Sequence, residues 1–177
     1  TALPFSRSLA LQLMASCGLE LEIGDVKGVF LSSGPLERPE GKLYCSFPPG
    51  GIPGAGKEGL FELQSNLYGF SSAPPRWQQT ADKECRAAGF APSMYDPCLY
   101  FMYDPQGLCG VLITHVDDFL FGGKGAKYKK GVRYLRGRFS FRSWRVGAGE
   151  LTGSYVSQNR ETGVISLQQR KYADSMK

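Results

Sequence analysis

The feature that most constrains the fold of this chain is a pair of adjacent aspartates inside an apolar run. The run from Val111 to Phe121 reads Val-Leu-Ile-Thr-His-Val-Asp-Asp-Phe-Leu-Phe. Both flanks are rich in β-branched and aromatic residues, which predicts two strands joined by a turn at Asp117 and Asp118. Carboxylates at the edge of a buried sheet are costly without a compensating cation, so a divalent metal site is one interpretation. A solvated acidic turn is the other, because aspartate is common in turns.

Composition narrows the class of protein. The chain has 177 residues, of which 42% are hydrophobic and 21% charged, enough for one domain with a core and unlike a disordered segment. Its five cysteines are scattered and form no Cys-x-x-Cys pair, which predicts reduced thiols in an intracellular protein, not a secreted one. A single histidine argues against a zinc site. No signal peptide and no apolar stretch of roughly 18 residues is present.

Positive charge gathers in the second half of the chain, where the net charge of +5 has its main source. The clustered cations are Lys124, Lys127, Lys129, Lys130, Arg133, Arg136, Arg138, Arg142 and Arg145. A basic stripe of this density fits a nucleic-acid phosphate backbone. The alternative is an ordinary solvated helix face, because basic surfaces are common.

The residue pattern predicts an alternation of helices and short strands. Helices are expected at 6–16, 71–88 and 125–137 and from 168 onward, and strands at 19–26, 42–47, 99–103, 108–114, 119–121, 139–145, 150–158 and 163–167. Residues 60–67 are ambiguous, and Gly122-Gly123 is expected to end the strand before it. This order predicts an α+β fold: an antiparallel sheet with helices packed on one face.

A third carboxylate completes a candidate catalytic set. Asp25 lies near the end of the strand at 19–26, and in an antiparallel sheet that position can neighbour the turn at Asp117 and Asp118. Successive residues on a regular strand point to opposite faces, so a turn is what lets adjacent carboxylates aim at one point. Three carboxylates can hold two Mg²⁺ ions roughly 3.5–4 Å apart. Mg²⁺ also keeps positions open for substrate phosphates.

Five segments then carry a family resemblance. Residues 25–31 read Asp-Val-Lys-Gly-Val-Phe-Leu, residues 66–77 read Asn-Leu-Tyr-Gly-Phe-Ser-Ser-Ala-Pro-Pro-Arg-Trp, residues 96–100 read Asp-Pro-Cys-Leu-Tyr, residues 115–118 read His-Val-Asp-Asp, and residues 163–172 read Gly-Val-Ile-Ser-Leu-Gln-Gln-Arg-Lys-Tyr. In this order they resemble the reverse transcriptases of copia-type LTR retrotransposons, in the palm and partial fingers segment of the Pol polyprotein. The ordered match is more specific than any single segment.

The resemblance implies a polymerase palm-like sheet and an RNA-directed DNA polymerase. Residues 1–177 would be its catalytic core fragment, with partial fingers and palm, and with the N-terminal fingers, thumb, RNase H and integrase absent. The reaction would be a two-Mg²⁺ nucleotidyl transfer from a dNTP to a primer 3′-hydroxyl, with Mn²⁺ able to replace Mg²⁺. The implied partners are an RNA or DNA template-primer, dNTPs and other Pol domains, with no membrane. Two alternatives stay open: a decayed or domesticated nucleic-acid binding module without catalysis, and a purely structural fragment.

The resemblance also assigns roles to individual residues. Asp25, Asp117 and Asp118 would be catalytic and would hold the metal together with the backbone carbonyl of Val26. On the nucleotide side, Phe30 would exclude a 2′-hydroxyl by its bulk, with Tyr68 and Gly69 beside it; the alternative for Phe30 is core packing. The residues implied to contact nucleic acid are His115, Val116, Arg76 and Lys171.

Three departures from the family pattern bear on activity. His115 replaces a tyrosine, and its charge can vary with pH. The family carries Ser-Leu-Tyr-Gly-Leu-Lys-Gln where residues 66–72 read Asn-Leu-Tyr-Gly-Phe-Ser-Ser, so a cation near the nucleotide is lost at Ser71. Gly28-Val29 replaces Thr-Ala and places a bulkier residue before Phe30.

Overall fold

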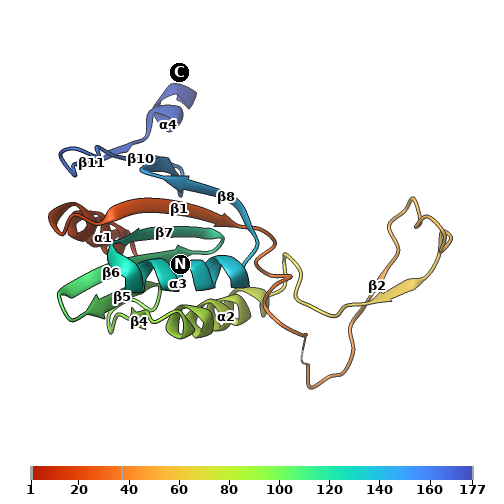
Figure 1. The fold of residues 1–177 in the computed structure, drawn as a ribbon. Helices are drawn as coiled ribbons and strands as arrows, with labels where there is room; N and C mark the ends of the chain where they lie inside the picture. The colour runs from red at the N-terminus through yellow and green to blue at the C-terminus, as the bar shows by residue number, and fades with distance from the viewer. Residues whose placement is uncertain (1, 37, 177) are drawn as a thin grey trace.

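A six-stranded antiparallel sheet forms the centre of the chain in the computed structural model, which describes residues 2–36 and 38–176 apart from the side chain of Lys171 (Figure 1). In chain order the elements are α1 (Pro4–Ser16), β1 (Glu20–Val26), β2 (Tyr44–Ser46), β3 (Leu60–Glu62), α2 (Ala73–Ala87), β4 (Ala91–Pro92), β5 (Leu99–Asp104), β6 (Gly107–His115), β7 (Asp118–Gly123), α3 (Gly125–Arg138), β8 (Phe141–Val146), β9 (Ala148–Leu151), β10 (Ser154–Gln158), β11 (Ile165–Gln168) and α4 (Arg170–Ser175). None of the helices in this described part is long and apolar enough to cross a membrane.

The strand order of the main sheet is β4-β5-β6-β7-β1-β8, and all of its pairs are antiparallel. A smaller sheet has the order β11-β10-β9, and β2 pairs with β3. The α+β class is confirmed. Because β1 runs between β7 and β8, the end of β1 that carries Asp25 lies beside the start of β7.

Both faces of the main sheet are covered. On one face the aromatic residues Tyr100, Phe119 and Phe121 pack with Trp77 of α2 and Leu135 of α3. Helices α2 and α3 therefore share one face, as predicted. On the other face α1 packs through apolar side chains such as Met14, and β9 and β10 contribute Leu151 and Val156. The opposite face is thus covered as well, which the prediction of helices on one face did not include.

The predicted break at Gly122-Gly123 is wrong, because both glycines continue β7 and pair with β1 and β6. Their role is to leave space above and below the sheet. A Cβ atom on Gly122 would collide with Met14 of α1, and one on Gly123 would collide with the ring of Tyr128 of α3. Glycine inside a strand commonly marks such a close approach, so these two positions allow a helix to pack on each face.

Most other boundaries agree with the sequence pattern to within two residues, although β4 was not predicted and the turn expected at Asp117 and Asp118 lies at Val116 and Asp117. Two further differences are larger. The ambiguous stretch 60–67 contains only a short strand, β3, which pairs with β2. The single strand expected at 150–158 is divided into β9 and β10 by a turn at Thr152 and Gly153, both of which have positive φ angles, 46° and 76°. This turn brings the Thr152 backbone to the acidic end of the main sheet.

An arm extends from one side of the sheet-and-helix body (Figure 1). It consists of the chain between β1 and α2 and carries β2 and β3, which pair in antiparallel register with Cys45 opposite Phe61. The rings of Phe47 and Phe61 lie 4.7 Å apart between their centroids and pack the arm against itself. The arm returns to the body at the N-terminal end of α2, so that end is a junction between the two parts.

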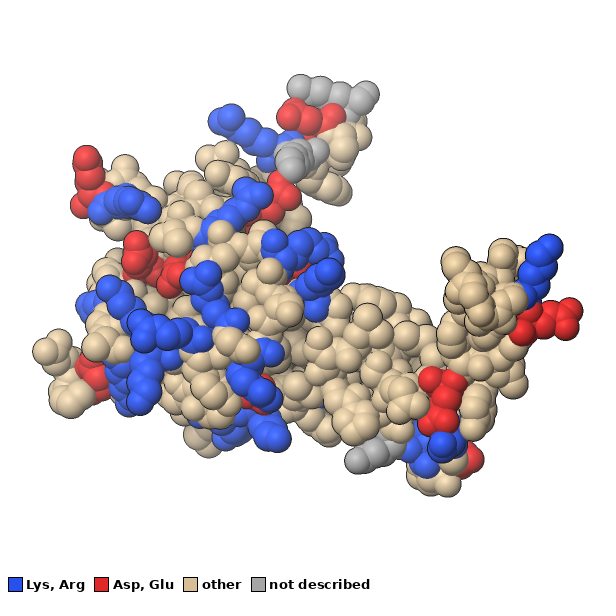
Figure 2. Space-filling view, turned by 45° about the vertical axis from the view of Figure 1, so that its right-hand side comes forward, with Lys and Arg blue, Asp and Glu red and all other residues tan. Residues whose placement is uncertain are grey.

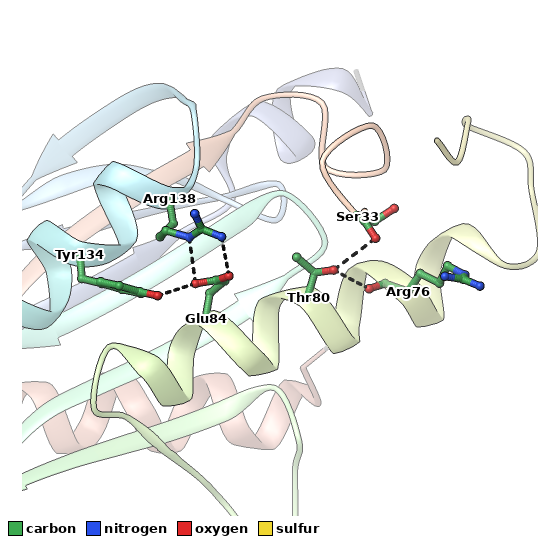
Figure 3. Close-up of polar contacts among 6 residues, drawn as sticks. All are labelled: Ser33, Arg76, Thr80, Glu84, Tyr134 and Arg138. Atoms are coloured by element: carbon green, nitrogen blue, oxygen red, sulfur yellow. Dashed lines mark hydrogen bonds and ion pairs between the residues drawn. The ribbon is translucent and has the colours of Figure 1, made fainter. Parts of the chain in front are cut away.

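Helices α2 and α3 are joined by a polar cluster at their contact (Figure 3). The Glu84 carboxylate accepts hydrogen bonds from Arg138 Nη2 at 2.9 Å and Arg138 Nε at 3.1 Å, and from the Tyr134 hydroxyl at 2.8 Å. The Glu84 side chain is 6% exposed, whereas that of Arg138 is 56% exposed. Hydrogen bonds from Arg138 and Tyr134 lower the pKa of Glu84 despite the opposing effect of burial.

We expect Glu84→Gln to lower the free energy of unfolding by about 1–2 kcal/mol at pH 7, because it removes a charge-assisted hydrogen-bonded pair. A carboxyl whose folded pKa is depressed stabilises the fold above its ordinary value of 4.5, and this contribution is lost as the pH falls through the folded pKa. The difference between variant and wild type should therefore shrink towards about pH 3. Urea denaturation at several pH values measures it.

Asp82→Asn is the matched control, since it lies on the same helix. Its ion pair with Arg86, at 2.7 Å, has side chains 32% and 56% exposed, so its loss should cost less than about 0.5 kcal/mol. Equal losses in the Glu84 and Asp82 variants would contradict a special role for the α2–α3 cluster.

Candidate active site

The acidic turn is a two-residue hairpin whose backbone is strained. His115 of β6 pairs with Asp118 of β7, and Val116 and Asp117 connect them. Val116 has φ 55°, in the left-handed region that a β-branched residue rarely adopts. Such a conformation costs of order 1–3 kcal/mol and persists only where the surroundings hold it.

Two hydrogen bonds hold this turn in place. The Trp77 indole Nε1 donates to the Val116 carbonyl at 2.6 Å, and the Val26 backbone N–H donates to the Asp117 carbonyl at 2.8 Å. Trp77 is buried in the aromatic core beneath the sheet, so the turn is fixed both to α2 and to the end of β1. The Trp77 side chain packs in the core, and it also supports the turn, a role that the sequence did not reveal.

The structure brings two of the three predicted carboxylates together. Asp25 of β1 lies directly opposite Asp118 of β7 in the antiparallel register. Directly opposite residues project from the same face with Cβ atoms about 4.5–5.5 Å apart. Both line a cavity of about 290 Å³, whose lining residues are Ile23, Asp25, Asp118, Ser143, Arg145, Glu150, Thr152 and Gly153. Asp117 is not among them.

The two carboxylates are incompletely compensated. Asp118 Oδ2 accepts a hydrogen bond from the Thr152 backbone N–H at 3.2 Å. Asp25 Oδ2 lies 3.6 Å from Arg142 Nη1, but Asp25 Oδ1 is buried and makes no hydrogen bond within the described part of the chain. Burial raises the pKa of Asp118, the Thr152 N–H opposes that effect, and the charges of Asp117 and Asp25 add to it.

This arrangement fits a hard divalent cation in part. An orphaned buried carboxylate oxygen and a neighbouring carboxylate with a raised pKa are both relieved by a cation bound between them, and carboxylate oxygens are the ligands that Mg²⁺ prefers. Among the described residues, however, no three acidic, histidine or cysteine side chains are placed so as to hold one metal ion together. The arrangement is thus a pair of carboxylates with Asp117 adjacent in the turn.

At pH 7 the ionised Asp118 carboxylate is expected to lower the stability of the fold. Because its folded pKa is above the ordinary value of 3.8, the folded state holds the proton more tightly than the unfolded chain. The free energy of unfolding contributed by this group therefore falls as pH rises from about 3.8 through the raised pKa. Asp118→Asn should increase the free energy of unfolding at pH 7 by about 0.5–1 kcal/mol in metal-free urea denaturation.

The gain should disappear at about pH 3, where the carboxyl is neutral in both states. Glu161→Gln is the control, since Glu161 is an exposed acid in the turn after β10 and its neutralisation should change little at either pH. A variant Asp118→Asn that is less stable than wild type at pH 7 would contradict the burial argument.

The residues predicted to face the nucleotide lie at the base of the arm. The rings of Phe30 and Tyr68 meet edge to face, 4.8 Å between centroids. Phe30 is half-buried and also packs against the aromatic core, while Tyr68 is 64% exposed. Gly69, with φ 94°, lines a second cavity of about 500 Å³ together with Arg76 of α2. The roles of these residues stay predictions.

The residues predicted to contact nucleic acid are dispersed. His115 lines a third cavity of about 280 Å³ that Arg7 also lines, and burial lowers the pKa of His115 although the carboxylates of Asp118 and Asp117 partly oppose this. Arg76 Nη1 donates to the Pro35 carbonyl at 3.4 Å, in the chain between β1 and α2. The predicted contact of Lys171 lies outside the described side chains.

The clustered cations have different surroundings, which their sequence spacing did not distinguish. Figure 2 shows Lys and Arg side chains gathered over the sheet-and-helix body. Arg138 binds Glu84, Arg136 lies over the Trp144 ring at 4.7 Å, and Arg142 faces Asp25. Lys129, Lys130 and Arg133 are exposed on α3. A nucleic-acid stripe along α3 stays a prediction, while Arg142 belongs to the surroundings of the acidic pair.

Three contacts of the site were missed from sequence: the Trp77 indole, the Thr152 backbone N–H and the Arg142 guanidinium. Each joins elements far apart in the chain. The Thr152-Gly153 pair does carry a turn signal in its glycine. For Trp77 and Arg142 no local signal distinguishes a residue that supports the site from one that packs in the core or faces solvent.

The comparisons with known proteins identify the family of this chain. Residues 7–176 match the family described as "Reverse transcriptase (RNA-dependent DNA polymerase)", and the chain belongs to that family. It is similar to the "Retrovirus-related Pol polyprotein from transposon TNT 1-94" of Nicotiana tabacum, with 31% identity over 167 residues and 93% of this chain covered. The match spans only 12% of that polyprotein. The resemblance to copia-type retrotransposon reverse transcriptases is thereby confirmed.

Proposed function

We propose that this chain forms the palm and partial fingers of an RNA-directed DNA polymerase that extends a primer 3′-hydroxyl with deoxynucleotides. The observation that carries the proposal is the cross-strand pair Asp25 and Asp118, with its orphaned buried oxygen, in a chain of the reverse transcriptase family. A pair of undercompensated carboxylates beside an open cavity is costly as pure architecture and suits a site that binds a cation with a phosphate substrate.

The metal-binding residues would be Asp25 and Asp118, with Asp117 in the turn and the Val26 carbonyl at the end of β1. When bound, Mg²⁺ or Mn²⁺ supplies the positive charge that stabilises the phosphates and favours ionisation of the attacking hydroxyl. The protein contributes position and a fixed electrostatic setting. Trp77 and Val26 hold the turn, so the carboxylates need little rearrangement when the substrates arrive.

The substrates would meet between the acidic turn and the base of the arm. The primer oxygen attacks the α-phosphorus of the dNTP, a new phosphodiester bond forms, and the bond to the leaving pyrophosphate breaks. Phe30 would bound the sugar on the side of its 2′-carbon, with Tyr68 and Gly69 beside it. His115 and Val116 would lie near the primer end, and Arg76, Lys171 and the exposed cations of α3 would contact nucleic-acid phosphates.

The wider context is part of the same proposal. The chain would act with other domains of a Pol polyprotein, inside the cell in a cytoplasmic particle or the nucleus. The test is extension of a DNA primer on an RNA template by the full-length protein with Mg²⁺ and dNTPs, abolished by a chelator. Salt-dependent binding of the primer–template without extension under Mg²⁺ or Mn²⁺ would instead indicate a nucleic-acid binding module.

A further inference from the structure

A fully buried asparagine lies between the arm and α2, away from the acidic pair. Asn66 is 0% exposed, and a buried amide is costly unless its polar atoms are hydrogen-bonded. Its Nδ2 donates to Ser33 Oγ at 3.3 Å, and its Oδ1 accepts from Ser72 Oγ at 2.9 Å. Asn66 therefore connects the turn after β1 with the N-terminal end of α2.

The turn after β1 is held further through Ser33. The Ser33 hydroxyl donates to the Phe30 carbonyl at 2.6 Å, while the Ser33 carbonyl accepts from the Thr80 hydroxyl at 3.4 Å (Figure 3). Thr80 is on α2 and also bonds the Arg76 carbonyl at 3.0 Å. The Ser33 hydroxyl thus links the Phe30 backbone to Asn66, and the Ser33 carbonyl links the same turn to the middle of α2.

The same network fixes the second aromatic residue of the arm base. Tyr68 follows Asn66 by two positions, and its ring meets the Phe30 ring at 4.8 Å. One buried amide therefore constrains the two segments that carry these rings. Asn66 and Ser72 both differ from the residues in the copia-type segment, serine and glutamine, and they are hydrogen-bonded to each other in this chain.

We propose that Asn66 is a positioning residue that fixes the Phe30–Tyr68 pair and so sets how strongly the site prefers a deoxyribose over a ribose sugar. This inference rests on the proposed function, in which Phe30 bounds the nucleotide sugar. A ring that excludes one hydroxyl must be placed closely, because displacement of about 1 Å is enough to change rates by up to about 100-fold. Asn66 acts through Phe30 and does not itself contact the nucleotide.

The test measures kcat/KM for dNTP and for the matching rNTP with the full-length protein on a primer–template. We expect Asn66→Ala to lower the dNTP/rNTP ratio by about tenfold. A loss of folded protein lowers both constants equally and leaves the ratio unchanged. In a Phe30→Ala background, Asn66→Ala should cause no further change in the ratio, because the ring through which it acts is gone.

Two further variants sharpen the test. Ser72→Ala removes one donor to Asn66 while leaving the buried amide in place, and should lower the ratio about threefold even if Asn66→Ala fails to fold. Asn159→Ala is the matched control: Asn159 is exposed, accepts backbone hydrogen bonds from Glu161 and Thr162, and should leave the ratio unchanged.

The outcomes separate this inference from the proposed function. If wild type extends primers and neither Asn66→Ala nor Ser72→Ala changes the ratio, the positioning role is wrong and the polymerase proposal stands. If wild type extends nothing, the polymerase proposal fails. The positioning role is then decided by hydrogen exchange, where Ser72→Ala should accelerate exchange of the amides at 29–33 by about threefold or more. Unchanged exchange there would overturn it.

Discussion

Primer extension by the full-length protein is expected to fall by about 1,000-fold when Asp25 is replaced by asparagine. The substitution keeps the shape of the side chain and removes one of the three carboxylate charges, those of Asp25, Asp118 and Glu150, that line the cavity with Arg145. A bound metal contributes several kcal/mol of transition-state stabilisation, and about 1.4 kcal/mol corresponds to a factor of ten in rate. A 1,000-fold loss corresponds to about 4 kcal/mol, which lies within that contribution.

A second measurement ties this loss to the metal. A ligand that binds only the folded state raises the melting temperature, so Mg²⁺ should raise the melting temperature of wild type and not that of Asp25→Asn.

Asp117→Asn should also abolish extension. If it does not, the site consists of the cross-strand pair Asp25 and Asp118 alone. Asp104→Asn is the control, since Asp104 is an aspartate at the other hairpin of the same sheet, where it accepts a bond from the Gln106 N–H. Full extension by Asp25→Asn would remove the metal assignment.

Replacement of Trp77 should have the largest effect on stability. Trp77→Ala empties a buried site among Phe119 and Phe139, and is expected to lower the free energy of unfolding by about 3–5 kcal/mol. Trp77→Phe keeps most of the packing and removes the donor to the Val116 carbonyl. We expect Trp77→Phe to lower the free energy of unfolding by about 1–2 kcal/mol. It should also lower primer extension by about 10–100-fold, because the strained turn is then free to relax.

Trp144→Phe is the matched control for the indole bond. Its Nε1 donates to Glu22 Oε2 at 2.8 Å on the same sheet, and its ring packs against Phe121 and Phe141. Chemical denaturation and primer extension should show similar stability losses for the two Phe variants, with a clearly larger loss of extension for Trp77→Phe. If both variants lose stability and activity in the same proportion, Trp77 only packs the core.

The sequence predicted those parts of the fold that depend on local pattern. The β-branched and aromatic residues on both sides of Asp117 and Asp118 predicted a hairpin, and the structure has one there. The same local logic was wrong at Gly122 and Gly123, because the reason for these glycines lies in Met14 and Tyr128 of two helices on opposite faces. Local strand propensity predicts that a glycine ends a strand, because it carries no information about the side chains that pack against that glycine.

The sequence predicted that Asp25 neighbours the acidic turn, but not the geometry of that contact. The pairing of Asp25 with Asp118 follows from strand register, which no composition or spacing fixes. Contacts such as Thr152 with Asp118 depend on where a separate small sheet packs. The cations were placed in one group by spacing, although Arg138 and Arg142 face carboxylates and Lys129 faces solvent.

Helix α2 fixes the distance and the relative orientation of the two sides of the proposed site. Ser72 precedes its first turn and bonds Asn66, while Trp77, five residues later, bonds the acidic turn. An α-helix advances about 1.5 Å and turns about 100° per residue, so one inserted or deleted residue between them would rotate the indole out of the core. The length of this short segment is therefore fixed, whereas the loop at 48–59 on the arm is free to change length.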